Sequence, residues 1–281
     1  MVAWLDGHAK ERFFVWAHFF DPHFNYDPPD EHARAFGFDP AACGRIAKGI
    51  DIREIRALES SLTPAEVGCL TALYDAEILH TDVWIGHVLA ALDRLGLAGR
   101  TLVVISADHG EEFMERGRVG HEKTLFDEVL HVPLIVRPPV ATAGGFGAGT
   151  RVATPVGTRE MGALIGAALA GQPFAPSREV VSRTYLAGAN RPAAIELFAW
   201  RTATHKLVWR PGTGDLSLYD VVADPGERTK LADPERKEAL RQELARWMSA
   251  ARVEARAAPA EREEVRHEME EKLKSLGYVG D

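Results

Sequence analysis

Two apolar segments that each run directly into an acidic residue and a histidine constrain this chain most strongly. Residues 12–20 read RFFVWAHFF and are followed by DPH, and residues 101–107 read TLVVISA and are followed by DHG. Unbroken apolar runs of this length are typical of strands buried on both faces, as in a parallel sheet. The sequence therefore predicts an α/β domain with polar groups at the ends of two core strands.

A helix is predicted between these two segments. Thr63, Pro64 and Glu66 form a helix-start signature, with a capping residue, a proline at the first helical position and an acid two residues later. Apolar residues continue at helical spacing to residue 95, and Gly96 provides a stop. Because a strand–helix–strand connection is right-handed, both strands should end at one edge of the sheet, where open α/β sheets bind ligands.

The rest of the chain predicts another core strand and a smaller second domain. Residues 132–137 (VPLIVR) read as a third strand of the mostly parallel sheet. From about residue 180 the pattern changes to short strands of an antiparallel sheet, followed by an amphipathic helix over 234–256. We therefore expect an α/β domain over 1–175 and a C-terminal subdomain over 176–281.

Composition excludes several classes of protein. The 33 basic and 41 acidic residues give a formal charge of −8, which argues against a nucleic-acid partner. No apolar run reaches the roughly 20 residues that span a bilayer. Cys43 and Cys69 are too few for a disulfide scaffold and form no C-x-x-C pair. The first 20 residues do not read as a signal peptide, and localisation stays open.

Asp108 and His109 are candidate metal ligands on chemical grounds. A carboxylate is a hard oxygen ligand for Ca²⁺, Mg²⁺ or Mn²⁺. An adjacent imidazole shifts the preference towards Mn²⁺ or Zn²⁺. The tripeptide alone is not specific, and taken by itself it favours a simpler interpretation in which Asp108 caps a turn and His109 lies on the surface.

Four blocks of sequence, in order, resemble the sulfatase family of the alkaline phosphatase superfamily. They are FFVWAHFFDPHFNYDPP, LYDAEILHTDVWIGHVLAALDRLGLAGRTLVVISADHGEEF, GRVGHEKTLFDEVLHVPLIVRPP, and LYDVVADPGERTKLA with the terminal LKSLGYV. The second and third blocks are the most specific, and together the four cover most of the chain. The resemblance implies an alkaline-phosphatase-like α/β/α sandwich with a mostly parallel sheet, incomplete on its N-terminal side, plus a small antiparallel subdomain.

The resemblance also implies an activity, namely the hydrolysis of sulfuric esters, and a role for each candidate residue. Asp108 and His109 match metal ligands, with Ca²⁺ as the usual metal and Mn²⁺ as the alternative. His23 matches a histidine that contacts the sulfate or protonates the leaving oxygen. His121 falls where the family places a cationic group on the sulfate, and Lys123 is close enough to share that role.

The implied substrate is a sulfate-ester small molecule or glycan, and its identity depends on loops around the pocket. In this chain the corresponding loop is residues 24–43. Its aromatic side chains could stack on an aryl or sugar ring, or could equally serve to pack the loop: Phe24, Tyr26, Phe36 and Phe38.

One essential feature of the family is missing. Sulfatases use a formylglycine made within a C/S-x-P-x-R motif, but Cys43 is followed by GRIA and Cys69 by LTAL. Residues 174–178 (FAPSR) have the Pro-x-Arg spacing with Phe at the nucleophile position. The sequence therefore predicts the C-terminal portion of a sulfatase, lacking the nucleophile region and inactive alone.

Several alternatives stay open at this point. The chain could be a truncated reading frame, one half of a split enzyme with a separate N-terminal half, or a degenerate relative. A phosphonate monoester or phosphodiester hydrolase of the same superfamily would use the same metal ligands. A non-catalytic binding or assembly module, including a homo-oligomer, is the alternative from a different class.

Overall fold

The computed structural model describes residues 1–121, 123–145, 149–186 and 195–257. Within these residues, no helix is long and apolar enough to span a membrane. The first part of the chain is helical, with α1 (Val2–His8), α2 (Asp30–Ala35), α3 (Ile52–Leu58), η1 (Glu59–Ser61), α4 (Pro64–Arg94) and η2 (Ala98–Arg100).

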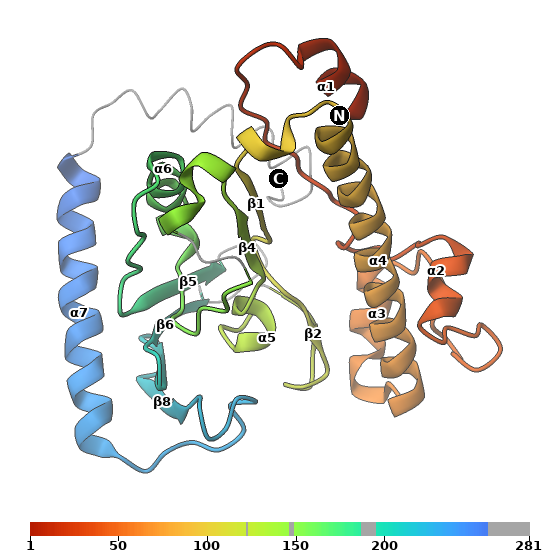
Figure 1. The fold of residues 1–281 in the computed structure, drawn as a ribbon. Coiled ribbons are helices and arrows are strands. Elements are labelled where there is room, and N and C mark those ends of the chain that lie inside the picture. Colours follow the sequence, from red (N-terminus) through yellow and green to blue (C-terminus); the bar gives the residue numbers. More distant parts are fainter. Residues whose placement is uncertain (122, 146–148, 187–194, 258–281) are drawn as a thin grey trace.

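Short strands and helices form the centre of the molecule. They are β1 (Val103–Ser106), β2 (Glu112–Phe113), β3 (Val119–Gly120), α5 (Asp127–Leu130), β4 (Leu134–Arg137), η3 (Val140–Gly145), η4 (Thr158–Glu160) and α6 (Met161–Ala170). The last described part contains β5 (Val180–Leu186), β6 (Ile195–Arg201), β7 (His205–Arg210), β8 (Asp215–Asp220) and α7 (Pro234–Ala257). Figure 1 shows α4 and α7 on opposite sides, with the strands between them.

Helix α4 confirms the helix predicted from the capping signature. The hydroxyl of Thr63 accepts a hydrogen bond from the Glu66 backbone N–H, and the Glu66 carboxylate accepts one from the Thr63 backbone N–H. Beyond the last turn, Gly96 has a φ of 66°, a left-handed conformation that glycine adopts without steric penalty. The sequence therefore specifies both ends of the longest helix.

The N-terminal half of α4 forms one side of a hydrophobic core. Leu70 and Leu73 are fully buried there, packed with Ile55 of α3 and with Tyr26 and Ile46 from the preceding loops. Burying side chains of this size contributes about 1.5–3 kcal/mol each. The core therefore holds the long segment before α3 firmly against the helix.

A disulfide joins Cys43 in this segment to Cys69 in α4. The sequence pattern gave no reason to pair these two residues, because neither lies in a recognisable motif and the chain is not a disulfide scaffold. Their pairing follows from packing, since Cys43 is fully buried in the same core as Leu70. Both thiols are therefore consumed by a structural bond.

We expect the Cys43→Ala/Cys69→Ala double variant to lose about 3 kcal/mol in free energy of unfolding. The bond closes a chain separation of 26 residues, and opening such a loop restores entropy to the unfolded chain. Urea unfolding of oxidised and reduced protein measures the loss. Dithiothreitol should destabilise the wild type by a similar amount and leave the double variant unchanged, and a wild type that is insensitive to reduction would contradict the bond.

Residues 12–20 do not form the predicted buried strand. The segment is irregular, and the side chains of Phe14 and Trp16 are 78% and 80% exposed. A strand needs a neighbour for its backbone N–H and C=O groups, and none of the described strands pairs with this segment. The apolar pattern identified a strand-like sequence but could not supply its partner.

The central strands are also paired differently from the prediction. β1 and β4 lie antiparallel, with Val103 opposite Arg137 and Ser106 opposite Leu134, whereas the sequence predicts both in a mostly parallel sheet. Between them the chain makes only the short β2–β3 hairpin and α5. Parallel neighbours require a long crossover connection. Helix α4 could serve as such a connection to β1, but residues 12–20, the strand predicted before α4, do not form a strand.

The predicted C-terminal antiparallel sheet is confirmed. Strands β5, β6, β7 and β8 pair in chain order, each antiparallel to the next. Helix α7 packs on this sheet through Leu244, which is fully buried against Leu207 and Leu218. The boundary between the two predicted domains, at residues 175 and 176, stays a prediction.

Candidate functional site

Three imidazoles from three separate segments converge at one place. They belong to His23, to His109 in the turn after β1, and to His121 directly after β3. One ring nitrogen from each lies within 4.8 Å of the others. The His109 and His121 rings are stacked with centroids 3.8 Å apart, and His23 lies 5.3 Å from His121 and 6.3 Å from His109. The structure therefore brings together three of the five predicted site residues.

Each of these rings is fixed by a hydrogen bond from its Nδ1 atom. His23 donates to the carbonyl of Phe24 at 3.0 Å, and His109 donates to the carbonyl of Gly110 at 2.9 Å. His121 donates to a carboxylate oxygen of Glu111 at 3.1 Å. Because an acceptor at Nδ1 keeps the proton there in the neutral ring, the lone pair lies on Nε2 in all three histidines.

The β2–β3 hairpin explains how Glu111 reaches His121. Glu112 lies opposite Gly120 in this hairpin, so the residue before Glu112 and the residue after Gly120 lie side by side. The Glu111 side chain is only 3% exposed and also accepts a hydrogen bond from the Tyr26 hydroxyl at 3.2 Å. The hairpin thus places a buried carboxylate directly behind one imidazole of the cluster.

Glu111 and Tyr26 are site residues whose roles the sequence analysis missed. Glu111 follows the DHG turn directly, and its place opposite His121 depends on a hairpin too short to give a strand pattern. Tyr26 is predicted as an aromatic of the substrate loop, but it is fully buried. Burial, with Glu111 nearby, raises the pKa of Tyr26 well above its usual range, so the hydroxyl stays a neutral donor.

The other aromatic residues predicted for substrate stacking differ in their exposure. Phe38 is buried in the same core as Tyr26, and these two side chains serve packing. Phe24 is partly buried against that core, whereas Phe36 is exposed. Of the four candidates, Phe36 is therefore the most accessible to a ligand.

Asp108 and Lys123 are the remaining predicted site residues. The Asp108 side chain is 68% exposed, and one of its carboxylate oxygens lies 3.9 Å from Nε2 of His109. Its other oxygen accepts a hydrogen bond from the His109 backbone N–H at 3.0 Å. Lys123 is half-buried, and the choice between Lys123 and His121 as the cationic contact stays a prediction.

Close packing against α5 holds the turn that carries Asp108 and His109. The backbone N–H of Gly110 donates to the carbonyl of Val129 at 2.7 Å. A Cβ at Gly110 would overlap the carbonyl oxygen of Glu128. The glycine of the DHG sequence is therefore required by the approach of the α5 backbone.

Glu77 of α4 is a buried acid beneath the loop that follows His23. Its carboxylate accepts a hydrogen bond from the Asp27 backbone N–H at 2.7 Å. Burial raises the pKa of Glu77 to about 7, and the nearby Asp21 and Asp27 carboxylates add to the increase. The folded protein therefore holds this proton at pH values at which the unfolded chain has released it.

We expect stability to fall as pH rises from about 4.5 to about 7, by about 1–3 kcal/mol from Glu77 alone. Glu77→Gln should remove this part of the pH dependence and raise stability at pH 8, because the amide oxygen still accepts from Asp27 without charge. Urea unfolding at pH 5 and pH 8 measures the effect. Exposed Glu235→Gln is the control, and an unchanged pH profile in Glu77→Gln would contradict the assignment.

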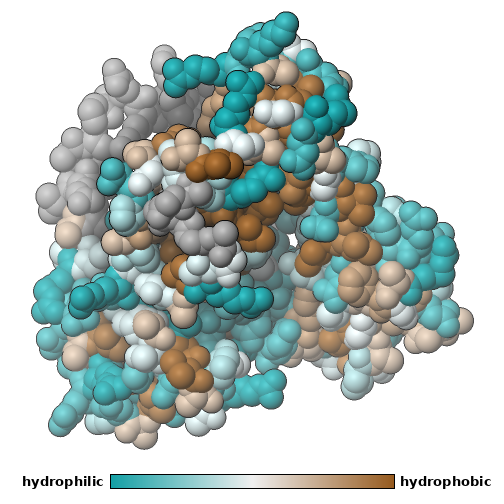
Figure 2. All heavy atoms as spheres, viewed as in Figure 1, coloured by the Kyte–Doolittle hydropathy of each residue, from teal (hydrophilic) through white to brown (hydrophobic). Residues whose placement is uncertain are grey.

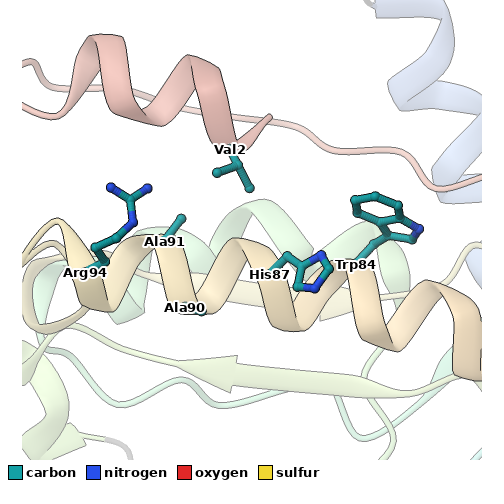
Figure 3. A pocket seen from close by; sticks show the side chains of 6 residues that line it. All are labelled: Val2, Trp84, His87, Ala90, Ala91 and Arg94. Carbon is teal, nitrogen blue, oxygen red and sulfur yellow. The ribbon is translucent and has the colours of Figure 1, made fainter.

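The groove shown in Figure 3 is a separate feature. It lies between α1 and α4, has a volume of about 410 Å³ and is lined by Val2, Trp84, His87, Ala90, Ala91 and Arg94. Its walls are mainly apolar, and Arg94 is paired with Asp6 at 2.7 Å. Figure 2 shows apolar surface over the same helical part of the molecule. None of the five predicted site residues lines this groove.

The sequence of this chain is similar to those of known proteins. The sulfatase family model matches residues 1–159, which is more than half of the 281-residue chain. The chain belongs to the sulfatase family. Human arylsulfatase K is 35% identical to it over 82 residues, and the zebrafish (Danio rerio) arylsulfatase K is 34% identical over 82 residues. These matches cover 29% of this chain and 15% and 16% of the two relatives.

Solved structures show the same fold. A phosphonate monoester hydrolase from Agrobacterium radiobacter aligns with a TM-score of 0.63 and 22% identity, covering 90% of this sulfatase-family chain and 59% of the hydrolase. A 2-O GAG sulfatase aligns with a TM-score of 0.60 and 18% identity, covering 92% and 58% of the two chains. The predicted alkaline-phosphatase-like α/β fold is therefore confirmed, and the chain spans less than two thirds of the length of these relatives.

Sulfatases generally bind a divalent metal, and the described residues do not by themselves fit the predicted Ca²⁺. Ca²⁺ takes six to eight oxygen ligands. The cluster contributes three imidazoles, and Asp108 adds a single carboxylate beside them. This donor set is dominated by nitrogen, which suits borderline cations such as Zn²⁺ better than Ca²⁺.

Proposed function

We propose that this chain provides part of the active site of a sulfatase that hydrolyses sulfuric esters. The observation that supports this most directly is the convergence of His23, His109 and His121, three residues that the family resemblance assigns to the site. They come from segments up to 98 positions apart, and all three lie within the part of the chain that the sulfatase model matches.

His23 is the proposed proton donor to the leaving alcohol. Its Nδ1 proton is held by the Phe24 carbonyl, which leaves Nε2 to carry the transferable proton when the ring is protonated. Proton transfer by a positioned histidine typically contributes 10²- to 10⁴-fold to a rate. The fixed ring orientation is therefore what this role requires.

His121 is the proposed contact to the sulfate group, with Lys123 as the alternative. The buried Glu111 carboxylate accepts the Nδ1–H of His121 and so orients the ring. Positive groups fixed before the reaction stabilise the negative charge of the sulfuryl oxygens in the transition state. Tyr26 in turn holds Glu111 in place.

Asp108 and His109 are the proposed metal ligands of the complete enzyme. Ca²⁺ remains the metal that the family resemblance implies, with Mn²⁺ as the alternative. A hard cation would need several oxygen ligands in addition to Asp108, and we propose that most of them belong to a segment outside the described residues. This proposal therefore depends on a further polypeptide segment.

The nucleophile is also proposed to lie outside this chain. Covalent catalysis of sulfuryl transfer needs an activated nucleophile, and both cysteines are tied up in the Cys43–Cys69 disulfide. We therefore propose an N-terminal sulfatase half as the source of the nucleophile, because each copy in a homo-oligomer of this chain would carry the same disulfide-bonded cysteines. The disulfide also supports an exported or periplasmic location, because such bonds persist in oxidising compartments.

The substrate class follows from the same proposal. The family resemblance supports a sulfate-ester small molecule or glycan. A phosphonate monoester or phosphodiester is the second candidate, favoured by the fold shared with the Agrobacterium radiobacter hydrolase. Comparing the rates at which a sulfate ester and a phosphonate ester are hydrolysed under the same conditions distinguishes the two substrate classes.

The experiment uses purified residues 1–281 with Ca²⁺ or Mn²⁺ and p-nitrophenyl sulfate. We expect no turnover by the chain alone, and turnover after addition of a separately expressed upstream segment whose C-x-P-x-R motif has been converted to formylglycine. p-Nitrophenyl phenylphosphonate, tested in parallel, should be the poorer substrate. Preference for the phosphonate would assign the alternative activity.

Two outcomes would contradict the proposal. Metal-dependent turnover by the chain alone that is lost in Asp108→Ala would place the nucleophile within these 281 residues. Absence of turnover in the complemented sample, with the two segments shown to bind each other, would favour a non-catalytic binding or assembly module.

A further inference from the structure

We propose that His23, His109 and His121 form a binding site for a borderline divalent cation, with Zn²⁺ as the probe and Asp108 as the fourth ligand. This site would be a property of the chain itself and does not depend on the proposed sulfatase activity. It shares Asp108 and His109 with the Ca²⁺ site that the family resemblance implies, but it takes a different metal and adds His23 and His121 as ligands. While such a cation is bound, these two histidines would be unable to play the catalytic roles proposed above.

The first argument is the state of the three rings. Metal-binding histidines commonly donate their second ring N–H to a carbonyl or carboxylate, which fixes the tautomer and orients the ring. Two of these rings donate Nδ1–H to a backbone carbonyl and the third donates it to the Glu111 carboxylate. Each Nδ1 atom is therefore already engaged in the way that metal-binding histidines commonly show.

The second argument is an unsatisfied polar atom within the cluster. Nε2 of His109 is inaccessible to solvent and has no hydrogen-bond partner. A buried polar atom without a partner is destabilising. A cation bound to Nε2 would satisfy this atom. Because the ring proton is on Nδ1, Nε2 carries the lone pair that can bind a cation.

The third argument is the spacing of the nitrogen atoms. Zn²⁺ binds imidazole nitrogen at about 2.0–2.1 Å in a tetrahedral arrangement, which places ligand atoms roughly 3.4 Å apart. The three nitrogens lie within 4.8 Å of one another. Zn²⁺ binding would require the stacked His109 and His121 rings to rotate until their nitrogens point at one position.

The fourth argument is charge. Asp108 places a carboxylate oxygen 3.9 Å from Nε2 of His109, and Glu111 lies behind His121 with its carboxylate 3.1 Å from Nδ1. Two carboxylates therefore balance the charge of one divalent cation on three neutral imidazoles. Among the described residues, these three histidines form the one group of three or more potential ligands with this spacing.

Calorimetric titration of metal-free residues 1–281 at pH 7.5 tests the proposal. We expect one equivalent of Zn²⁺ to bind at least about 100-fold more tightly than Ca²⁺, since imidazole nitrogen favours borderline cations. Co²⁺ should give the intense visible absorption of a four-coordinate site. Zn²⁺ should also raise the Tm of the protein, because it binds only the folded chain.

Variants locate the site. His109→Gln should weaken Zn²⁺ binding at least tenfold, and Glu111→Gln should weaken it about tenfold by releasing the His121 ring. His131→Gln removes an exposed histidine that is not part of the cluster and should leave the affinity unchanged. Circular dichroism reports whether each variant folds. If His109→Gln does not fold, His23→Gln, which lies on a separate loop, is used in its place.

The proposal is overturned if Ca²⁺ binds more tightly than Zn²⁺. It is also overturned if folded His109→Gln and His23→Gln both bind Zn²⁺ as the wild type does, since the metal would then lie on other surface histidines. Both measurements are made without substrate, so their outcome is independent of whether the protein hydrolyses a sulfate ester.

Discussion

Lys206→Met is expected to lower the free energy of unfolding by about 3–5 kcal/mol, because it leaves the buried Glu227 carboxylate without its cation. It also removes one of the two cations beside the half-buried Asp127, which keeps Arg201 at 3.6 Å. The Lys206 side chain is fully buried, and its Nζ lies 2.7 Å from Asp127 and 2.8 Å from Glu227. Burial already raises the pKa of Glu227, and Lys206 opposes this increase. Methionine keeps the approximate length of the side chain but supplies no charge.

The ion cluster matters to the site because of where Asp127 lies. Asp127 begins α5 and donates its backbone N–H to Glu227 at 2.7 Å. The same helix provides the Val129 carbonyl that holds Gly110. Lys206 in β7 therefore links the C-terminal sheet to the turn that carries His109, and its loss should loosen that turn.

Chemical denaturation of Lys206→Met measures the effect against exposed Lys230→Met, which should change stability by less than about 0.5 kcal/mol. The double variant Lys206→Met/Glu227→Gln should be less destabilised than the sum of the two single variants, because one uncompensated charge is removed. Additive losses of stability, or a Lys206→Met variant as stable as the wild type, would show that Lys206 and Glu227 do not stabilise each other as described.

Gly110→Ala is expected to destabilise the protein by about 3 kcal/mol or more. The added methyl group would overlap the carbonyl oxygen of Glu128, and its next neighbours are also backbone atoms of α5. Backbone cannot move aside as a flexible side chain can. The variant should therefore displace either α5 or His109, and in the second case it should also weaken metal binding.

Gly86→Ala is the matched control and should have the opposite sign. Gly86 lies within α4, and nothing lies within 4 Å of where its Cβ would be. Alanine is favoured over glycine in a helix by about 0.5–1 kcal/mol. Comparison of the two Tm values measures both effects, and a stable Gly110→Ala variant with unchanged metal affinity would contradict the close packing described here.

The parts of the fold set by local interactions could be predicted from the sequence. Thr63, Glu66 and Gly96 specify the ends of α4 through contacts within a few residues of each other. The antiparallel sheet after residue 180 follows from alternation and turns. For the site, the predicted strand–helix–strand connection places His23 and His109 at one edge of the sheet. The two residues do approach each other, although residues 12–20 form no strand.

The parts that depend on distant partners could not be predicted. Strand formation at 12–20 needs a neighbouring strand, and the β1–β4 pairing needs the path of the intervening hairpin. The Cys43–Cys69 bond and the burial of Tyr26 arise from packing against α4. Lys206 in β7 reads as an ordinary surface lysine of an alternating strand, and only the structure places it beside Asp127 and Glu227.

The most direct test of the proposed site is kcat/KM for p-nitrophenyl sulfate in the complemented protein, with His23→Gln compared with His131→Gln. Loss of the leaving-group acid should lower kcat/KM by at least about 100-fold, whereas the exposed His131 should change it less than about threefold, as expected of a residue without contact to substrate. An unchanged kcat/KM in folded His23→Gln would contradict the assignment of this cluster as the active site.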